Sequence, residues 1–263
     1  MILLLKRKYV RYIMADITEW VGRLGNNILQ LIRAIHYCRM CGSNLVKFPK
    51  HVFLTNIQIV VNGGLDERHI HDTFFSLKHF GISDPEPHEM RSLFRTYIRP
   101  IMNVTIDRDG SNILFIHIRS GDTFSSTPHG AYVPPPLYFY NKVISKFTST
   151  HIVYEDDRNP TVDQLRKNSS VSLSSRTISE DLHELLRAEN LAIGFGTFGF
   201  LIYLMSVNLK DLYIPRYVLN ELPAGSWGED TTLHIIELPN YINVGEWKNT
   251  KQQRQTILEY NPI

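Results

Sequence analysis

The residues with the clearest chemical potential lie in one short loop. The segment FIHIRSGD (115–122) places His117, Arg119, Gly121 and Asp122 at the end of an apolar run. Arginine offers a planar fork of donors with a permanent charge, which matches the oxygens of a phosphate group. The glycine would allow close backbone approach of a ligand. The open alternative is that Arg119 and Asp122 only pair with each other and close a turn.

A second loop, GRLGNN (22–27), precedes a helix-periodic segment. Gly25 and Asn26 therefore lie where the backbone amides at a helix N-terminus attract anions. An ordinary glycine-containing turn before a helix would give the same pattern.

The third polar stretch combines Asp181 with the turn formed by Gly196, Thr197 and Phe198. Asp181 follows the capping-box sequence TISE (177–180), and the turn follows the apolar residues 191–193. Asp181 could also serve only to compensate the helix dipole.

Hydrophobic periodicity indicates which elements position these loops. In the first half we expect a helix over 26–41, stopped by Gly42, strands at 45–48 and 57–61, and a mixed, mostly helical region over 69–100. In the second half we expect strands at 113–118, 151–154, 171–173, 191–193 and 212–214, alternating with helices near 137–147, 163–167, 177–189 and 198–207. This alternation is typical of an α/β fold with a doubly wound parallel sheet. Such sheets bind ligands outside the carboxyl ends of their strands, which is where the three loops fall.

The motifs resemble those of the fucosyltransferases. HIRSGD (117–122) is similar to the H-x-R-x-G-D motif of α-1,2-fucosyltransferases, with relatives among α-1,6- and protein O-fucosyltransferases. GRLGNN is similar to their G-R-[LF]-G-N-Q opening, with Asn27 in place of Gln, and the third stretch resembles their last motif, with Gly196 where relatives often carry Ser. Weaker similarity involves Tyr132 and the segment YEDD (154–157). The resemblance spans residues 20 to 215 in the same order.

The resemblance implies a GT-B-like fold with two Rossmann-like halves facing a cleft. An acceptor-side domain (1–105) would contribute Gly25 and Asn26, and a donor-binding domain (106–263) would hold a nucleotide sugar, with GDP-fucose as the implied donor. His117, Arg119, Asp181, Gly196, Thr197 and Phe198 would bind the donor, with Asp181 at the guanine edge. Transfer to a glycan hydroxyl would invert the anomeric carbon and need no metal or other cofactor.

Catalysis would depend on Arg119, which would stabilise charge on the leaving phosphate. Asp122 is the first candidate for the base, although orienting Arg119 is an equal alternative, and Glu19, Asp72 and His129 follow. The acidic run 155–157 offers the available carboxylate cluster for a divalent cation.

Composition excludes some other classes. Lys and Arg number 28 against 26 Asp and Glu, a net charge of +2, which argues against a nucleic-acid surface. The N-terminal apolar run is four residues long, too short for a signal peptide or a membrane span, so we expect a cytoplasmic protein. Cys38 and Cys41 form a C-x-x-C for which core packing is favoured over redox chemistry.

Two alternatives stay open. The same fold could use a UDP-sugar such as UDP-xylose, because Gly196 departs from the family pattern. A non-catalytic nucleotide- or glycan-binding module would keep the fold without turnover. The acceptor, the linkage and the oligomeric state have no signature in the sequence.

Overall fold

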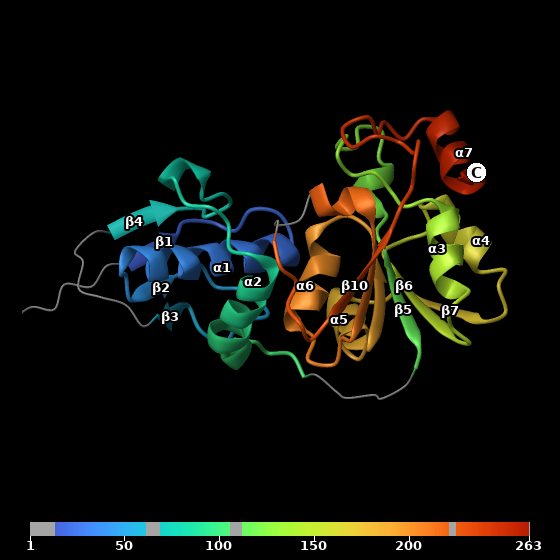
Figure 1. The fold of residues 1–263 in the computed structure, drawn as a ribbon. Coiled ribbons are helices and arrows are strands. Elements are labelled where there is room, and N and C mark those ends of the chain that lie inside the picture. Colours follow the sequence, from blue (N-terminus) through green and yellow to red (C-terminus); the bar gives the residue numbers. More distant parts are fainter. Residues whose placement is uncertain (1–13, 62–68, 106–111, 221–224, 263) are drawn as a thin grey trace, which may run out of the picture. The chain divides into compact units, whose positions relative to one another are not determined.

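The computed structural model describes residues 14–61, 69–105, 112–220 and 225–262 (Figure 1). Contacts divide the chain into two units. Unit 1 contains residues 1–85 and 92–103, and unit 2 contains residues 86–91 and 104–263. The N-terminal apolar run and the expected domain start at Ile106 lie outside the described residues.

Unit 1 is built on a mixed four-stranded sheet with the order β3-β2-β1-β4. Its strands are β1 (Met14–Ile17), β2 (Leu45–Lys47), β3 (Gln58–Val60) and β4 (His69–Asp72). β1 pairs in parallel with β2 and β4, and β3 runs antiparallel to β2. The sheet therefore presents three parallel carboxyl ends at one edge.

Helix α1 (Leu24–Cys41) is the main helix of unit 1. Its buried stripe includes the fully covered Ile28, Leu31, Ile32 and Ile35, as the helical spacing predicts. It begins two residues earlier than predicted, and it ends at Gly42, whose φ of 73° gives the left-handed cap conformation.

The region predicted as mostly helical, 69–100, is more varied. It begins with β4, which the alternating HIHD sequence did not reveal, and continues with a 3-10 turn, η1 (Lys78–Phe80). Helix α2 (Pro87–Leu93), a π-helical turn, η2 (Phe94–Ile98), and a 3-10 turn, η3 (Arg99–Ile101), follow.

The first part of α2 belongs to unit 2. Arg91 is 4% exposed, and its guanidinium donates to Asp230, to the Thr231 hydroxyl and to the Ser206 carbonyl, each at 2.8 Å. It also lies over the Tyr203 ring at 4.9 Å. This buried cation, satisfied by three groups, fixes the start of α2 to unit 2.

Unit 2 contains a six-stranded parallel sheet with the order β10-β9-β8-β5-β6-β7. Its strands are β5 (Leu114–Ile118), β6 (Thr150–Tyr154), β7 (Val171–Ser174), β8 (Asn190–Ile193), β9 (Asp211–Pro215) and β10 (Thr232–Ile236). Numbered along this unit, the order is 3-2-1-4-5-6, that of doubly wound dinucleotide-binding sheets. The order reverses between β5 and β8, so the crevice expected for a ligand opens at their carboxyl ends.

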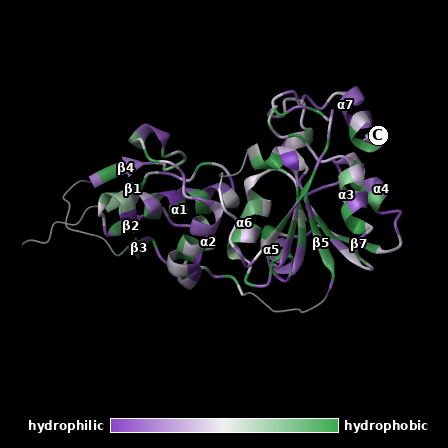
Figure 2. Cartoon of the chain, viewed as in Figure 1, coloured by the Kyte–Doolittle hydropathy of each residue, from purple (hydrophilic) through white to green (hydrophobic). Residues whose placement is uncertain are grey.

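Helices cover both faces of this sheet (Figure 1). Helices α3 (Leu137–Ile144), α4 (Pro160–Leu165) and α7 (Lys251–Glu259) contact one another on one face, and α5 (Ile178–Leu186) and α6 (Thr197–Met205) pack together on the other. Two 3-10 turns, η4 (Gly121–Phe124) and η5 (Arg216–Asn220), follow β5 and β9. β5 and α6 are largely hydrophobic (Figure 2), because both are buried. The α/β class and the parallel sheet are therefore confirmed.

The predicted elements of unit 2 all occur, with ends shifted by a few residues. The predicted last strand is followed by β10, which was missed together with β1 and α7. The sequence of β10, TLHII, has little alternation, and α7 has a weakly apolar sequence with one fully buried side chain, Ile257. No helix among the described residues is long and apolar enough to cross a membrane.

Candidate functional site

The loop after β5 is held by the loop after β6. Ser120 is fully buried, and its amide donates to Glu155 Oε2 at 3.1 Å while its hydroxyl donates to the Asp156 carbonyl at 2.9 Å. Gly121 donates its amide to Asp156 Oδ2 at 3.2 Å. Asn159, also fully buried, caps α4 with Oδ1 and donates Nδ2 to the Arg119 carbonyl at 3.2 Å. The backbone that carries Arg119 is thus fixed by side chains from the neighbouring strand end.

Gly121 is required by the approach of Glu155 rather than of a ligand. Its φ is +48°, and a Cβ there would lie 2.5 Å from Glu155 Oε1. The group that approaches this glycine in the structure is a carboxylate of the protein itself, that of Glu155.

The Arg119 guanidinium lies beside a pair of stacked aromatic rings. Its Cζ is 4.5 Å from the centre of the Tyr132 ring and 5.3 Å from that of Phe195, and these two rings are themselves stacked. Nη2 donates to both carboxylate oxygens of Asp122, at 2.9 and 3.0 Å. Nε is buried and has no hydrogen-bond partner among the described residues. The ion pair left open as an alternative by the sequence therefore forms, and the guanidinium lies beside the two stacked rings, just after the carboxyl end of β5.

Gly196 lies against this guanidinium. It precedes the first residue of α6, Thr197, and has φ +102° and ψ 154°, a conformation essentially restricted to glycine. A Cβ at this position would lie 2.7 Å from Arg119 Nη1. Any side chain larger than hydrogen at this position would meet Arg119 as it is placed here.

His117 lies in β5 and packs against Phe198, with ring centres 5.0 Å apart. Burial, opposed by the Glu155 charge and assisted by the Arg119 charge, lowers the pKa of His117 to about 4. The imidazole is neutral at physiological pH, so it can donate one hydrogen bond and accept another without adding charge beside Arg119.

Asp181 lies in the first turn of α5, after the confirmed capping box of Thr177 and Glu180. Its Oδ1 is buried without a hydrogen-bond partner among the described residues. Burial raises the pKa of Asp181, against a smaller lowering by a hydrogen bond from the Arg176 backbone. A half-buried carboxylate with an unused oxygen is suited to accept hydrogen bonds from a ligand, although no contact joins it to the Arg119 group in this structure.

Gly25 and Asn26 lie in the first turn of α1, in unit 1. The Asn26 side chain folds over Gly22, where a Cβ would lie 2.3 Å from its Nδ2. The preceding turn is fixed by a buried side-chain amide, that of Gln30, which the sequence did not indicate. Gln30 is fully buried, accepts from the Val21 amide at 2.9 Å and donates to two carbonyls, those of Glu19 and Thr73.

Asn27, which stands where the fucosyltransferases carry Gln, connects this turn to the loop after β2. Its Nδ2 donates to the Val21 carbonyl at 3.2 Å, and its Oδ1 lies 3.3 Å from His51 Nε2. Because His51 Nδ1 accepts from the Phe53 amide, Nε2 carries the proton, and burial lowers the pKa of this imidazole. Asn27 is therefore a structural link between the two loops.

The second-choice bases differ in their surroundings. Asp72 accepts from the Phe74 amide at 2.6 Å and pairs with His79 at 3.0 Å, so it is already engaged. His129 is exposed, and its ring lies 4.9 Å from that of Tyr132, which in turn contacts Arg119. The carboxylate of Glu19 is exposed at the end of β1 in unit 1. Of the three, His129 is the one beside the Arg119 group.

The acidic run after β6 is largely engaged with the protein. Glu155 and Asp156 accept from the backbone amides described above, and Asp157 pairs with Arg166 at 2.7 Å. No group of three His, Cys, Asp or Glu side chains in the described part of the chain is arranged to hold a metal ion. Burial raises the pKa of the Cys38 thiol to about 11, which suits a core position better than redox chemistry.

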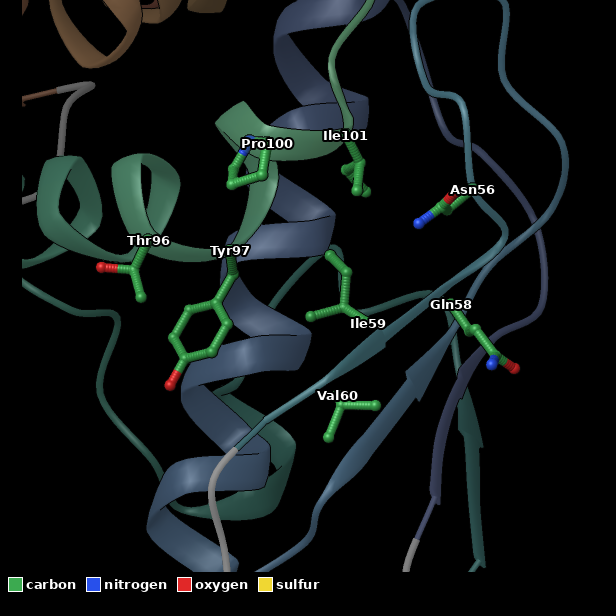
Figure 3. A pocket seen from close by; sticks show the side chains of 8 residues that line it. All are labelled: Asn56, Gln58, Ile59, Val60, Thr96, Tyr97, Pro100 and Ile101. Atoms are coloured by element: carbon green, nitrogen blue, oxygen red, sulfur yellow. The ribbon is translucent and has the colours of Figure 1, made fainter.

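A cavity of about 310 Å³ lies elsewhere, in unit 1 (Figure 3). The Asn56 amide points between Ile59 and Ile101, whereas the Gln58 amide points away. Its lining residues are uncharged: Asn56, Gln58, Ile59, Val60, Thr96, Tyr97, Pro100 and Ile101. None of the predicted site residues contributes to it, so the cavity does not mark the Arg119 site.

The stacked pair of rings beside Arg119 was not predicted. The sequence indicated Tyr132 only through a weak similarity and did not indicate Phe195, because ring stacking across two loops leaves no pattern along the chain. Comparison of the chain with protein-family models, with curated proteins and with solved structures finds no match, so the chemistry rests on the site itself.

Proposed function

We propose that this protein is a nucleotide-sugar-dependent glycosyltransferase of the fucosyltransferase type. The observation that carries the proposal is the position of Arg119. Its guanidinium lies at the carboxyl end of β5, beside the glycine that opens α6, where a sheet of order 3-2-1-4-5-6 binds nucleotides. A fixed cation next to a helix N-terminus is suited to a diphosphate.

A GDP-linked donor is favoured over a UDP-linked one by Asp181. Guanine presents two adjacent donors, N1–H and the N2 amino group, whereas the hydrogen-bonding edge of uracil presents one donor, N3–H. A carboxylate with a buried, unused oxygen matches the guanine pair. GDP-fucose is the donor that the family resemblance implies, and a UDP-sugar is the second candidate.

In the proposed reaction, a hydroxyl oxygen of a glycan attacks the anomeric carbon as the bond from that carbon to the β-phosphate oxygen breaks. The bonding electrons pass to the leaving diphosphate, where Arg119 stabilises the growing negative charge. The hydroxyl proton passes to the Asp122 carboxylate, or to His129 in the alternative. The products are the inverted glycoside and the nucleoside diphosphate.

Metal-independent transfer remains part of this proposal. Arg119 and the amides at the start of α6 supply positive electrostatic potential at the phosphate, and the nearby acidic side chains Glu155 and Asp156 are committed to backbone amides. Thr197, the first residue of α6, would add a hydroxyl donor to the phosphate.

Isothermal titration with GDP and UDP, and transfer assays with GDP-fucose, test this proposal. We expect GDP to bind, and we expect Arg119→Ala to lower the transfer rate by about 10²–10³-fold. Equal product from wild type and Arg119→Ala would overturn the enzymatic role. Binding of UDP without GDP would favour the UDP-sugar alternative, and GDP binding without turnover would favour a non-catalytic module.

A further inference from the structure

The Arg119 guanidinium is the less exposed member of its ion pair. Its Cζ lies within 5.3 Å of the centres of both stacked rings, Tyr132 and Phe195, and Gly196 lies against Nη1. The Arg119 side chain is 17% exposed, and its Nη2 donates to Asp122. These contacts restrain the guanidinium, which is therefore the less mobile member of the pair.

Asp122 is the accessible member. Its side chain is 49% exposed, and it lies in the short 3-10 turn η4, three residues after Arg119. An exposed carboxylate that leaves an ion pair is hydrated by water instead, so such pairs contribute little to stability. A phosphate with two or more negative charges would compete well for the same nitrogen.

We propose that Asp122 occupies the anion position of Arg119 in the absence of ligand and that the diphosphate of the donor displaces it. This inference rests on the proposed function of the Arg119 site. Displacement releases the carboxylate from its cation, and a released carboxylate is a better proton acceptor than a paired one. Donor binding would therefore activate the base, and productive acceptor binding would follow the donor.

The test compares binding of inorganic pyrophosphate and GDP to wild type, Asp122→Asn and Arg119→Ala by isothermal titration. We expect Asp122→Asn to bind both ligands about 1.5- to 5-fold more tightly, because an exposed ion pair no longer competes. We expect Arg119→Ala to bind both much more weakly. Asp163→Asn is the matched control, since Asp163 also pairs with an arginine three residues away, Arg166, at 3.1 Å; its affinity should equal that of wild type.

Ionic strength separates contact competition from a general charge effect. At about 1 M salt the Debye length is about 3 Å, so a long-range effect of the lost charge should vanish. We expect the ratio of affinities between Asp122→Asn and wild type to remain above one at about 1 M salt. A ratio that falls to one there would overturn displacement.

The two proposals fail differently. If Arg119→Ala loses pyrophosphate binding while Asp122→Asn binds no more tightly than wild type, Asp122 positions Arg119, and the inference is wrong although the anion site stands. If Arg119→Ala binds as wild type does, both proposals are wrong. Circular dichroism of Asp122→Asn and a second variant, Asp122→Ser, exclude misfolding as the cause of weaker binding, because both variants must agree.

Discussion

Gly196 offers the sharpest perturbation of the site, through the substitution Gly196→Ala. The added Cβ would lie 2.7 Å from Arg119 Nη1, closer than a real Cβ tolerates, so the end of the Arg119 side chain must shift away from its present position. The backbone at φ +102° and ψ 154° adds strain of about 1–3 kcal/mol for a residue with a Cβ. We therefore expect loss of both stability and ligand binding.

The two losses have different magnitudes and different assays. For a unit of this size, about 1–3 kcal/mol corresponds to a fall in Tm of roughly 2–12 °C, measured by thermal unfolding. Loss of a charge-assisted hydrogen bond, worth about 1.5–3 kcal/mol, corresponds to roughly 10- to 150-fold weaker GDP binding, measured by titration.

Gly245→Ala is the matched control for the backbone contribution. Gly245 also belongs to unit 2 and has a φ of +98°, but nothing lies within 4 Å of the position of its Cβ. We expect Gly245→Ala to lower the Tm and leave GDP affinity unchanged. If Gly196→Ala binds GDP as tightly as Gly245→Ala, the proposed contact between Gly196 and Arg119 has no role in binding.

Three further predictions concern single residues of unit 2. The raised pKa of Asp181 means that the folded state favours its protonated form, so its ionisation costs stability as the pH rises. The Tm difference between Asp181→Asn and wild type should therefore be more positive at pH 7 than at pH 4, while GDP binding weakens. A Tm difference that does not change with pH would contradict this prediction. The lowered pKa of His117 has the opposite effect on the pH dependence of stability: its contribution is complete above pH 6.5 and is lost as the pH falls towards 4. His117→Gln should therefore reduce the fall in Tm between pH 6.5 and pH 4, and an unchanged dependence of Tm on pH would count against this assignment. Asn159→Asp keeps the acceptor for α4 but replaces the donor to the Arg119 carbonyl with a buried charge. It should lower the free energy of unfolding, measured by urea titration, by about 1–3 kcal/mol. The control Asn168→Asp, at an exposed position, should leave that free energy unchanged.

The sequence predicted the sheet of unit 2 well because the pattern there is strong. β5 and β8 consist mostly of buried apolar residues, and the capping box of Thr177 marks a helix start without ambiguity. β4 and β10 were missed because most of their side chains are exposed or half-buried, so a buried apolar pattern does not mark them. Local pattern detects an element only where its burial is regular.

The site was less predictable than the fold. The position of Arg119 after a buried strand could be read along the chain, since parallel strands present their carboxyl ends together. The ring contacts of Tyr132 and Phe195, and the ties from Glu155 and Asn159, join residues far apart in sequence. Whether Arg119 is paired or open also depends on geometry, because both arrangements use the same motif.

The anchoring of α2 by Arg91 has a practical consequence for dissecting the protein. A fragment that starts at residue 104 would contain nearly all of unit 2 but would lack this arginine. The Ser206 carbonyl and the Thr231 hydroxyl, both buried, would then lose the donor that satisfies them, and Asp230 would lose its counter-ion. An independently folding fragment of unit 2 should therefore begin no later than Glu86 and carry the short α2 segment with it.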